Sequence, residues 1–152
     1  MQTYLSKEGL DKLISELENR KSSLRREIAD RISNAKELGD LSENFEYQEA
    51  KEAQGTNEMR ILELEEMLKD VVVVESQSGA DVIQLGVRFS VQAQTQSERA
   101  FEMVGSTEAD PISGKISNES PLGRSFVGAK IGDVVVVETP AGTVEYTVTR
   151  IE

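Results

Sequence analysis

Residues 39–46 read G-D-L-S-E-N-F-E and separate two long segments that both carry helix signals. Two helices joined by so short a link must run antiparallel, so this stretch is predicted to be the turn of a helical hairpin. It places two carboxylates, Asp40 and Glu43, at the turn. Packing does not require acidic residues at the end of a long helical arm. The pattern therefore indicates that the arm delivers these acids to another molecule.

Both flanking segments repeat their seam positions in steps of four and three, which is typical of a coiled coil. The first is predicted to run over residues 6–38, with Ser6 as N-cap and Gly39 as a left-handed cap. Its seam is Leu10, Ile14, Leu17, Lys21, Leu24, Ile28, Arg31 and Ala35. The second is predicted over residues 42–73, with the seam Ala50, Gln54, Asn57, Ile61, Leu64, Leu68 and Val71. Helices of about 30 residues would give an arm about 45 Å long.

After the polar stretch 75–79, which we interpret as a linker, the apolar period changes to two. Strands are predicted near residues 87–93, 100–104 and 144–148, and the apolar run 134–137 is predicted to be a central strand. Residues 139–142 form a turn and residues 120–128 hold one short helix. We therefore expect an α+β chain, with a hairpin domain over residues 1–75 and a small antiparallel β-sheet domain over residues 80–152.

Composition narrows the possible chemistry. The chain has 152 residues, 38% of them hydrophobic and 5% aromatic, which argues against one large core. Its net charge of −11 disfavours binding to duplex DNA, so no sequence-specific DNA partner is expected. The absence of Cys and His excludes disulfides, thiol nucleophiles and histidine bases. With neither a signal-like N-terminus nor a membrane-length apolar run, we expect a cytoplasmic protein with no membrane partner.

Two interpretations of Asp40 and Glu43 are open. Asp-x-x-Glu resembles a capping box, and acids near a helix N-terminus gain roughly 0.3–1 kcal/mol from the helix dipole. Alternatively, the paired carboxylates hold Mg²⁺, which accepts few protein ligands when a substrate phosphate supplies others. Two carboxylates alone make a poor site, so the free protein is expected to bind no cofactor and to be inactive until it docks on a partner.

Lysines flank the turn on both sides. Lys36 and Lys51 are either an ordinary solvated surface or a local positive patch that steers a phosphate chain toward the acids. Arg25, Arg26 and Arg31 extend the positive charge, but acidic residues are interspersed among them. The Ser-Pro pair at 120–121 is by itself an ordinary start for a short helix.

The motif over residues 39–44, with Glu46, Tyr47, Lys51 and Glu52, resembles the tip of the bacterial Gre transcript-cleavage factors. Three further motifs are similar to sequence motifs of the same family and occur in the same order: residues 120–124, 128–133 and 139–142. The resemblance covers essentially the whole chain. It implies an N-terminal antiparallel coiled coil followed by an FKBP-like domain with a short helix.

The resemblance also implies a function. Gre factors dock on bacterial RNA polymerase and insert the coiled coil through its secondary channel. Their tip acids help the polymerase hold Mg²⁺ and a water against a backtracked RNA, whose 3′ end is cleaved. Asp40 and Glu43 match these acids, so a Mg²⁺ site shared with the polymerase is expected there. Lys36 and Lys51 match basic residues near the tip and are expected to contact the nascent RNA 3′ end.

The family is thought to grip the polymerase through a loop of its C-terminal domain, and Glu119, Ser120 and Pro121 match this loop. The chain would then be an accessory factor and not itself an enzyme. Three alternatives stay open: a Gre-like inhibitor that occupies the channel, a prolyl isomerase built on the FKBP-like domain, and a non-catalytic coiled-coil adaptor. An inhibitor departs from the two-acid tip, and an isomerase needs an aromatic-lined pocket.

Overall fold

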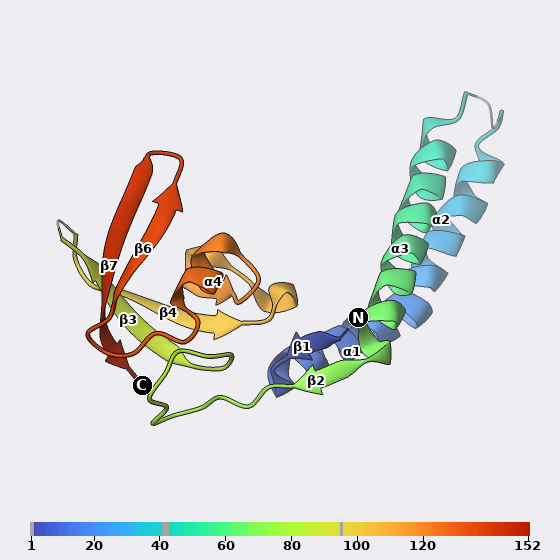
Figure 1. Ribbon diagram of the computed structural model, residues 1–152. Helices are drawn as coiled ribbons and strands as arrows, with labels where there is room; N and C mark the ends of the chain where they lie inside the picture. Colours follow the sequence, from blue (N-terminus) through green and yellow to red (C-terminus); the bar gives the residue numbers. More distant parts are fainter. Residues whose placement is uncertain (1, 41–42, 95) are drawn as a thin grey trace. The chain divides into compact units, whose positions relative to one another are not determined.

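The computed structural model describes residues 2–40, 43–94 and 96–152. Its contacts divide the chain into two compact units, which we describe separately (Figure 1). One unit is the helical segment Leu10–Asp70, and the other joins Met1–Gly9 to Val71–Glu152. The expected architecture, a helical hairpin followed by a small sheet domain with one short helix, is confirmed.

The hairpin consists of two antiparallel helical segments, of which the first is the longer. Its elements are α1 (Lys7–Asn19), the π-helical turn η1 (Arg20–Leu24), α2 (Arg25–Glu37) and α3 (Phe45–Lys69). The α3 seam is largely as predicted, since Ala50, Asn57, Ile61 and Leu64 are buried. The predicted end of this helix was wrong, because Val71 already belongs to a strand. The predicted start at residue 42 lies outside the described residues.

The π-helical turn changes the seam of the first segment. A turn that takes up one extra residue rotates the side chains that follow by about 100° relative to a continuous α-helix. Lys21, predicted on the seam, is exposed and pairs with Glu65 at 3.1 Å. Ile14 and Arg31, also predicted on the seam, are exposed as well, but both lie outside the turn. On either side of Arg31, Ile28 and Ala35 are buried as predicted. The four-three pattern missed the turn because it assumes a constant pitch.

A two-stranded parallel ladder was not predicted. It pairs β1 (Thr3–Leu5) with β2 (Val71–Val73), and Leu5 is only 1% exposed. Immediately after β1, the backbone N–H of Ser6 donates to a carboxylate oxygen of Glu108 at 2.8 Å, and the Ser6 hydroxyl donates to the other oxygen. The same hydroxyl accepts from the N–H of Gly9 at 3.0 Å, so Ser6 caps α1 as predicted. Glu108 thereby anchors the start of α1 within its own unit.

The second unit is built on a five-stranded sheet with the order β5-β4-β3-β7-β6. Its strands are β3 (Arg88–Ala93), β4 (Arg99–Val104), β5 (Lys115–Ser117), β6 (Val134–Thr139) and β7 (Gly142–Ile151). The short helix α4 (Pro121–Phe126) and the 3-10 turns η2 (Ser106–Glu108) and η3 (Pro111–Ser113) lie in its connections. The predicted turn at 139–142 joins β6 to β7.

Two features of the sheet differ from prediction. Strands β4 and β5 run parallel, so the sheet is mixed and not wholly antiparallel. The run 134–137 lies in β6 at the edge of the sheet and not at its centre. Val135 and Val137 face the core, whereas Val134 and Val136 are 58% and 54% exposed. A continuous apolar run indicates burial on both faces, and here the sequence itself carries no sign that one face stays open.

The core of this unit contains a group of aromatic rings among aliphatic side chains. Phe89, Phe101, Phe126 and Tyr146 are all buried, and neighbouring ring centroids lie between 5.3 and 6.3 Å apart. Phe126 comes from α4 and contacts the rings from three strands, so the helix is fixed against one face of the sheet. Such tilted ring pairs add to the stability gained by burial.

Candidate functional site at the hairpin tip

The tip connects the last turn of α2 to the first turn of α3. Leu38 ends α2 by donating its N–H to the carbonyl of Ala35 at 3.1 Å. Gly39 follows with a φ of 131°, a conformation that side chains rarely adopt. The chain therefore leaves the helix sharply at this glycine, and Asp40 comes next as an exposed residue.

Asn44 closes the tip. Its side-chain oxygen accepts from the N–H of Tyr47 at 3.1 Å, so Asn44 is the N-cap of α3. Its amide nitrogen donates to the carbonyl of Ala35 at 2.6 Å, near the end of α2. One side chain thus satisfies backbone groups at both helix ends. The sequence analysis missed this role, although an Asn before a helical run is itself a capping signal.

The capping-box interpretation, with Asp40 as the N-cap of α3, is therefore wrong. A capping box requires an N-cap acid or hydroxyl with a partner three residues on, and here Asn44 is the N-cap. Glu43 immediately precedes Asn44 in the sequence, and Asp40 comes earlier still. Both carboxylates belong to exposed residues at the end of the hairpin. Neither residue is the N-cap of α3.

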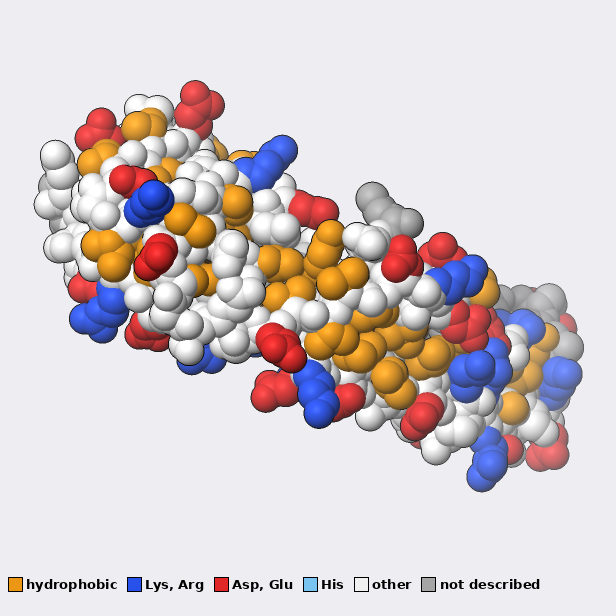
Figure 2. All heavy atoms as spheres, turned by 60° about the horizontal axis from the view of Figure 1, so that its bottom comes forward, with side chains coloured by type: hydrophobic (Ala, Val, Ile, Leu, Met, Phe, Trp, Pro, Cys, Tyr) orange, Lys and Arg blue, Asp and Glu red, His pale blue; other side chains and the backbone are white. Residues whose placement is uncertain are grey.

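The predicted lysines lie on opposite helices near the same end. Lys36 is exposed in the last turn of α2, and Lys51 is exposed on α3, where its ammonium donates to the side chain of Gln54 at 2.9 Å. Among the described residues, neither lysine forms an ion pair with a carboxylate. On the face drawn in Figure 2, acidic and basic side chains are interspersed along the hairpin, so any positive patch is local.

Two large apolar side chains flank the acids. Leu38 is 66% exposed and Phe45, the first residue of α3, is 80% exposed. Among the described residues, no side chain covers either of them to a large degree. Their exposure contrasts with the buried seam at Ile28 and Ala35.

The predicted docking loop is part of the start of α4. The Ser120 hydroxyl donates to the carbonyl of Ser117 at 2.7 Å and accepts from the N–H of Gly123 at 3.0 Å. Pro121 occupies the first helical position, where its missing N–H costs nothing, and it is exposed like Glu119. A Cβ on Gly123 would overlap the Ser117 carbonyl oxygen, so only glycine fits. The loop therefore presents Glu119 and Pro121 on a fixed support.

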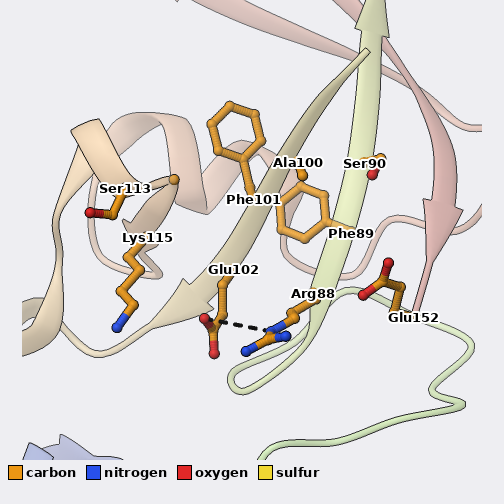
Figure 3. A pocket seen from close by; sticks show the side chains of 10 residues that line it. Arg88, Phe89, Ser90, Ala100, Phe101, Glu102, Ser113, Lys115 and Glu152 are labelled. Atoms are coloured by element: carbon orange, nitrogen blue, oxygen red, sulfur yellow. Dashed lines mark ion pairs between the residues drawn. The ribbon is translucent and has the colours of Figure 1, made fainter.

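A depression of about 400 Å³ lies over strands β3, β4 and β5 (Figure 3). Charged groups mark its mouth: the Arg88 guanidinium lies 3.7 Å from the Glu102 carboxylate, and Lys115 and Glu152 line it too. Phe89 and Phe101 contribute to its wall but are only 1% and 5% exposed. This depression is therefore not an open aromatic pocket of the kind that a prolyl isomerase needs.

Asp40 and Glu43 are the kind of ligand that Mg²⁺ binds, but two carboxylates are too few to form a site. Carboxylate oxygens are the ligands that Mg²⁺ prefers. However, the described residues include no group of three or more His, Cys, Asp or Glu side chains placed to hold a metal ion. Any site at Asp40 and Glu43 would need ligands from another molecule. Within the described residues, no helix is long and apolar enough to cross a membrane.

Comparisons with known proteins cover both units. Residues 3–73 match the family model "Transcription elongation factor, N-terminal", and residues 77–152 match "Transcription elongation factor, GreA/GreB, C-term". Transcription elongation factor GreA of Acetivibrio thermocellus is 45% identical over 152 residues, which is 99% of this chain and 96% of that protein. GreA of Thermosipho melanesiensis is 47% identical over 150 residues, with coverage of 98% and 96%.

The crystal structure of GreA factor homolog 1 from Thermus thermophilus is 28% identical and has a TM-score of 0.44, covering 100% of this chain and 99% of that one. The two family models together span nearly the whole sequence, and the two-acid tip lies within the first of them. The chain therefore belongs to the GreA/GreB family of transcription elongation factors.

Proposed function

We propose that this chain is an elongation factor that stimulates the transcript cleavage activity of bacterial RNA polymerase. The hairpin would enter the secondary channel and bring Asp40 and Glu43 to the polymerase active site. The observation that carries the proposal is the tip itself: two exposed acidic residues at the end of the hairpin, next to a helix start whose N-cap is Asn44 and neither acid. Membership of the elongation factor family supports it.

The chain is then an accessory factor, and the polymerase supplies the remaining ligands. Asp40 and Glu43 would hold Mg²⁺ together with the polymerase's own acids and an RNA phosphate. A second metal ion in such a site stabilises charge on the attacking or leaving oxygen. The tip residues would bind and orient, and the chain alone would not hydrolyse RNA.

The other predicted residues would divide the remaining work. Lys36 and Lys51 would contact the phosphates of the extruded RNA 3′ end, since neither is paired with a carboxylate among the described residues. Lys presents a point charge and not the planar fork of Arg, so each contact would be modest. Glu119, Ser120 and Pro121 would dock on the polymerase, which assigns binding to residues 80–152 and chemistry to residues 1–75.

The test uses a stalled, backtracked polymerase complex with labelled RNA. Wild-type protein should release short 3′ fragments. Asp40→Asn and Glu43→Gln should bind the complex with unchanged affinity but stimulate cleavage at least roughly a hundredfold less. Glu49→Gln is the matched control, because it removes an exposed acid near the same end of α3.

Each alternative predicts a different result. Near-normal cleavage by both acid variants would refute the catalytic assignment. A channel-binding inhibitor would bind the complex and slow elongation without any cleavage by the wild type. An independent nuclease would degrade naked RNA, and calorimetry would then detect tight Mg²⁺ binding to the free protein.

A further inference from the structure

The hairpin seam contains a polar cluster between two apolar stretches. Asn57 is only 3% exposed and is the one buried polar residue of α3 among those described. Toward the tip the seam holds Ile28 and Ala50, and toward the base it holds Ile61 and Leu64. A buried Asn at a seam position of a coiled coil usually specifies register at a cost in stability.

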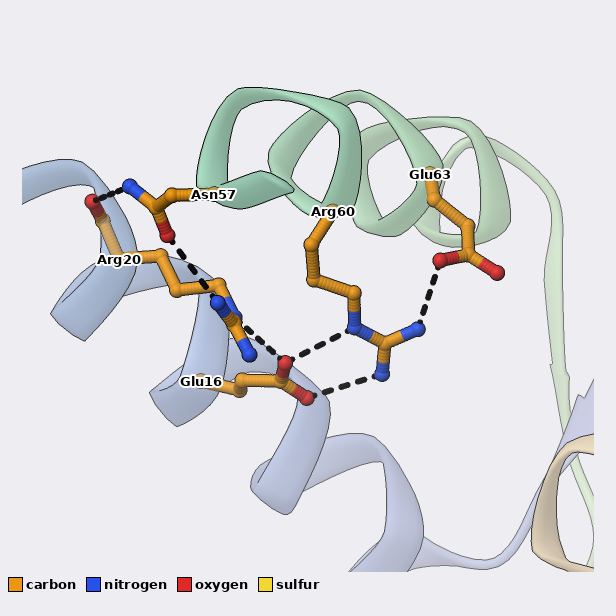
Figure 4. Close-up of polar contacts among 5 residues, drawn as sticks. All are labelled: Glu16, Arg20, Asn57, Arg60 and Glu63. Atoms are coloured by element: carbon orange, nitrogen blue, oxygen red, sulfur yellow. Dashed lines mark hydrogen bonds and ion pairs between the residues drawn. The ribbon is translucent and has the colours of Figure 1, made fainter. Parts of the chain in front are cut away.

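Asn57 pairs twice with the same residue of the opposite segment (Figure 4). Its amide nitrogen donates to the backbone carbonyl of Arg20 at 3.1 Å, and its oxygen accepts from the Arg20 guanidinium at 3.1 Å. Arg20 is the first residue of the π-helical turn η1. The widened turn and the buried amide therefore contact each other directly.

An ion-pair cluster adjoins this contact. The Glu16 carboxylate accepts from Arg60 of α3 through two bonds of 2.9 and 3.0 Å and from Arg20 at 2.7 Å. Arg60 also donates to Glu63 at 2.9 Å. These bonds, above all the one from Arg60, lower the pKa of Glu16 to about 2. A planar guanidinium that meets a carboxylate through two bonds fixes direction as well as distance.

Only one register of the hairpin permits these bonds. If α3 slid by one heptad, about 10 Å, either Ala50 or Leu64 would replace Asn57 opposite the Arg20 carbonyl. Ala53 or Met67 would replace Arg60 opposite Glu16. All four side chains are apolar and can neither donate to the carbonyl nor pair with the half-buried carboxylate. The apolar seam alone would tolerate both shifts.

We propose that Glu16, Arg20, Asn57 and Arg60 form a register lock that holds the π-helical turn against α3 and thereby positions Asp40 and Glu43. Without the lock, η1 would relax into a continuous α-helix. The distal hairpin would then rotate by about 100° and shift by about 1.5 Å relative to its base. Misplacement of about 1 Å can cost on the order of a hundredfold in rate. The positioning role rests on the proposed function; the lock itself does not.

The test compares Asn57→Leu with Gln54→Leu. Both replace a polar seam residue of α3 by the same apolar one, but among the described residues Gln54 is bonded only to Lys51 of its own helix. Nuclear magnetic resonance of residues 18–26 reports the π-helical turn, thermal unfolding reports stability, and cleavage is measured over a range of factor concentrations. Arg60→Lys is a milder variant, which keeps the positive charge but loses the planar guanidinium that makes two bonds to Glu16.

Asn57→Leu should lose the π-helical turn without a lower unfolding temperature. Its maximal cleavage rate should fall at least roughly tenfold, while the half-saturating concentration stays within about twofold. Gln54→Leu should keep the turn and the rate, and Arg60→Lys should lower the rate less than Asn57→Leu does. If Asn57→Leu reduced cleavage only by destabilising the protein, its unfolding temperature would fall instead.

Retention of the turn in Asn57→Leu would overturn the lock. Loss of the turn with an unchanged maximal rate would overturn the positioning role. If the wild type itself stimulated no cleavage, the proposed function would fail, while the resonance measurements would still decide whether the lock exists.

Discussion

The hairpin tip and the docking loop are both candidate functional regions, but they are supported differently. At the tip, Asn44 is the N-cap of α3 and also bonds to the end of α2, while neither acid is the N-cap. In the docking loop, Ser120 is both a candidate contact and the cap of α4. At the tip, the residues proposed to act on a partner differ from the residue that stabilises the turn, whereas in the loop Ser120 has both roles. Function and stability should therefore be separable by mutation at the tip but not in the loop.

The largest effect is expected at the tip. Asp40→Asn or Glu43→Gln should reduce cleavage by orders of magnitude and change the free energy of unfolding by less than about 0.5 kcal/mol, because neither residue is a cap. Cleavage assays and chemical denaturation of the same preparations would check both halves of this statement. A loss of stability of about 2 kcal/mol would show that the tip is no more separable than the loop.

The loop should show the opposite behaviour. Gly123→Ala forces a Cβ against the Ser117 carbonyl and should lower the free energy of unfolding by about 2–3 kcal/mol. Pro121→Ala leaves that contact alone and should weaken polymerase binding with a smaller change in stability. Denaturation and binding measurements on the two variants would distinguish the residue that stabilises the loop from the residue that contacts the polymerase. Equal stability of Gly123→Ala and wild type would contradict the described geometry.

The register lock predicts a pH dependence. The pKa of Glu16 is lowered from 4.5 to about 2, so its pairing stabilises the fold fully above pH 4.5 and is lost as the pH falls toward 2. Because the carboxylate is partly exposed, Glu16→Gln should cost only about 1–3 kcal/mol at neutral pH and should flatten the loss of stability in that window.

Acid denaturation followed by circular dichroism would measure this difference. Glu66→Gln is the control, since Glu66 pairs with Lys69 on a fully exposed surface and should change little. An acid transition with the same slope in Glu16→Gln and wild type would rule out the contribution of the lock.

The smallest effect is expected at the residue that closes the tip. Asn44→Ala removes a cap and a tie between two helix ends, and it should cost about 1 kcal/mol. Asn44→Asp keeps the capping oxygen and loses only the bond to Ala35, so it should cost less. Thermal unfolding would rank the two variants. Faster amide exchange near residues 45–48 in Asn44→Ala should accompany the loss.

The sequence predicted those elements that repeat regularly. Period-four-three and period-two patterns identified both helical segments, most strands and the β6–β7 turn, because side-chain spacing follows backbone geometry. The seam error at Lys21 arose at the π-helical turn, where Arg20 is bonded to Asn57 of the other helix. The edge position of β6 and the parallel ladder of β1 and β2 likewise depend on distant partners.

The candidate site was predicted in its location but not in its construction. Residues 39–46 identified the acids, while the capping role assigned to them belongs to Asn44. The catalytic, RNA-binding and docking roles of Asp40, Glu43, Lys36, Lys51 and the loop at 119–121 stay predictions. Exposure can show that a side chain is available, but a partner must be present to show what it touches.

The bond between Ser6 and Glu108 has a consequence for the order of folding on the ribosome. The hairpin needs contacts only within Leu10–Asp70, so it can form as soon as that segment has emerged. The first strand can pair with Val71–Val73 shortly afterwards. The bonds from Ser6 to Glu108, however, must wait until a residue 102 positions further along has been synthesised. The oldest part of the nascent chain should therefore be among the last to reach its final hydrogen bonds.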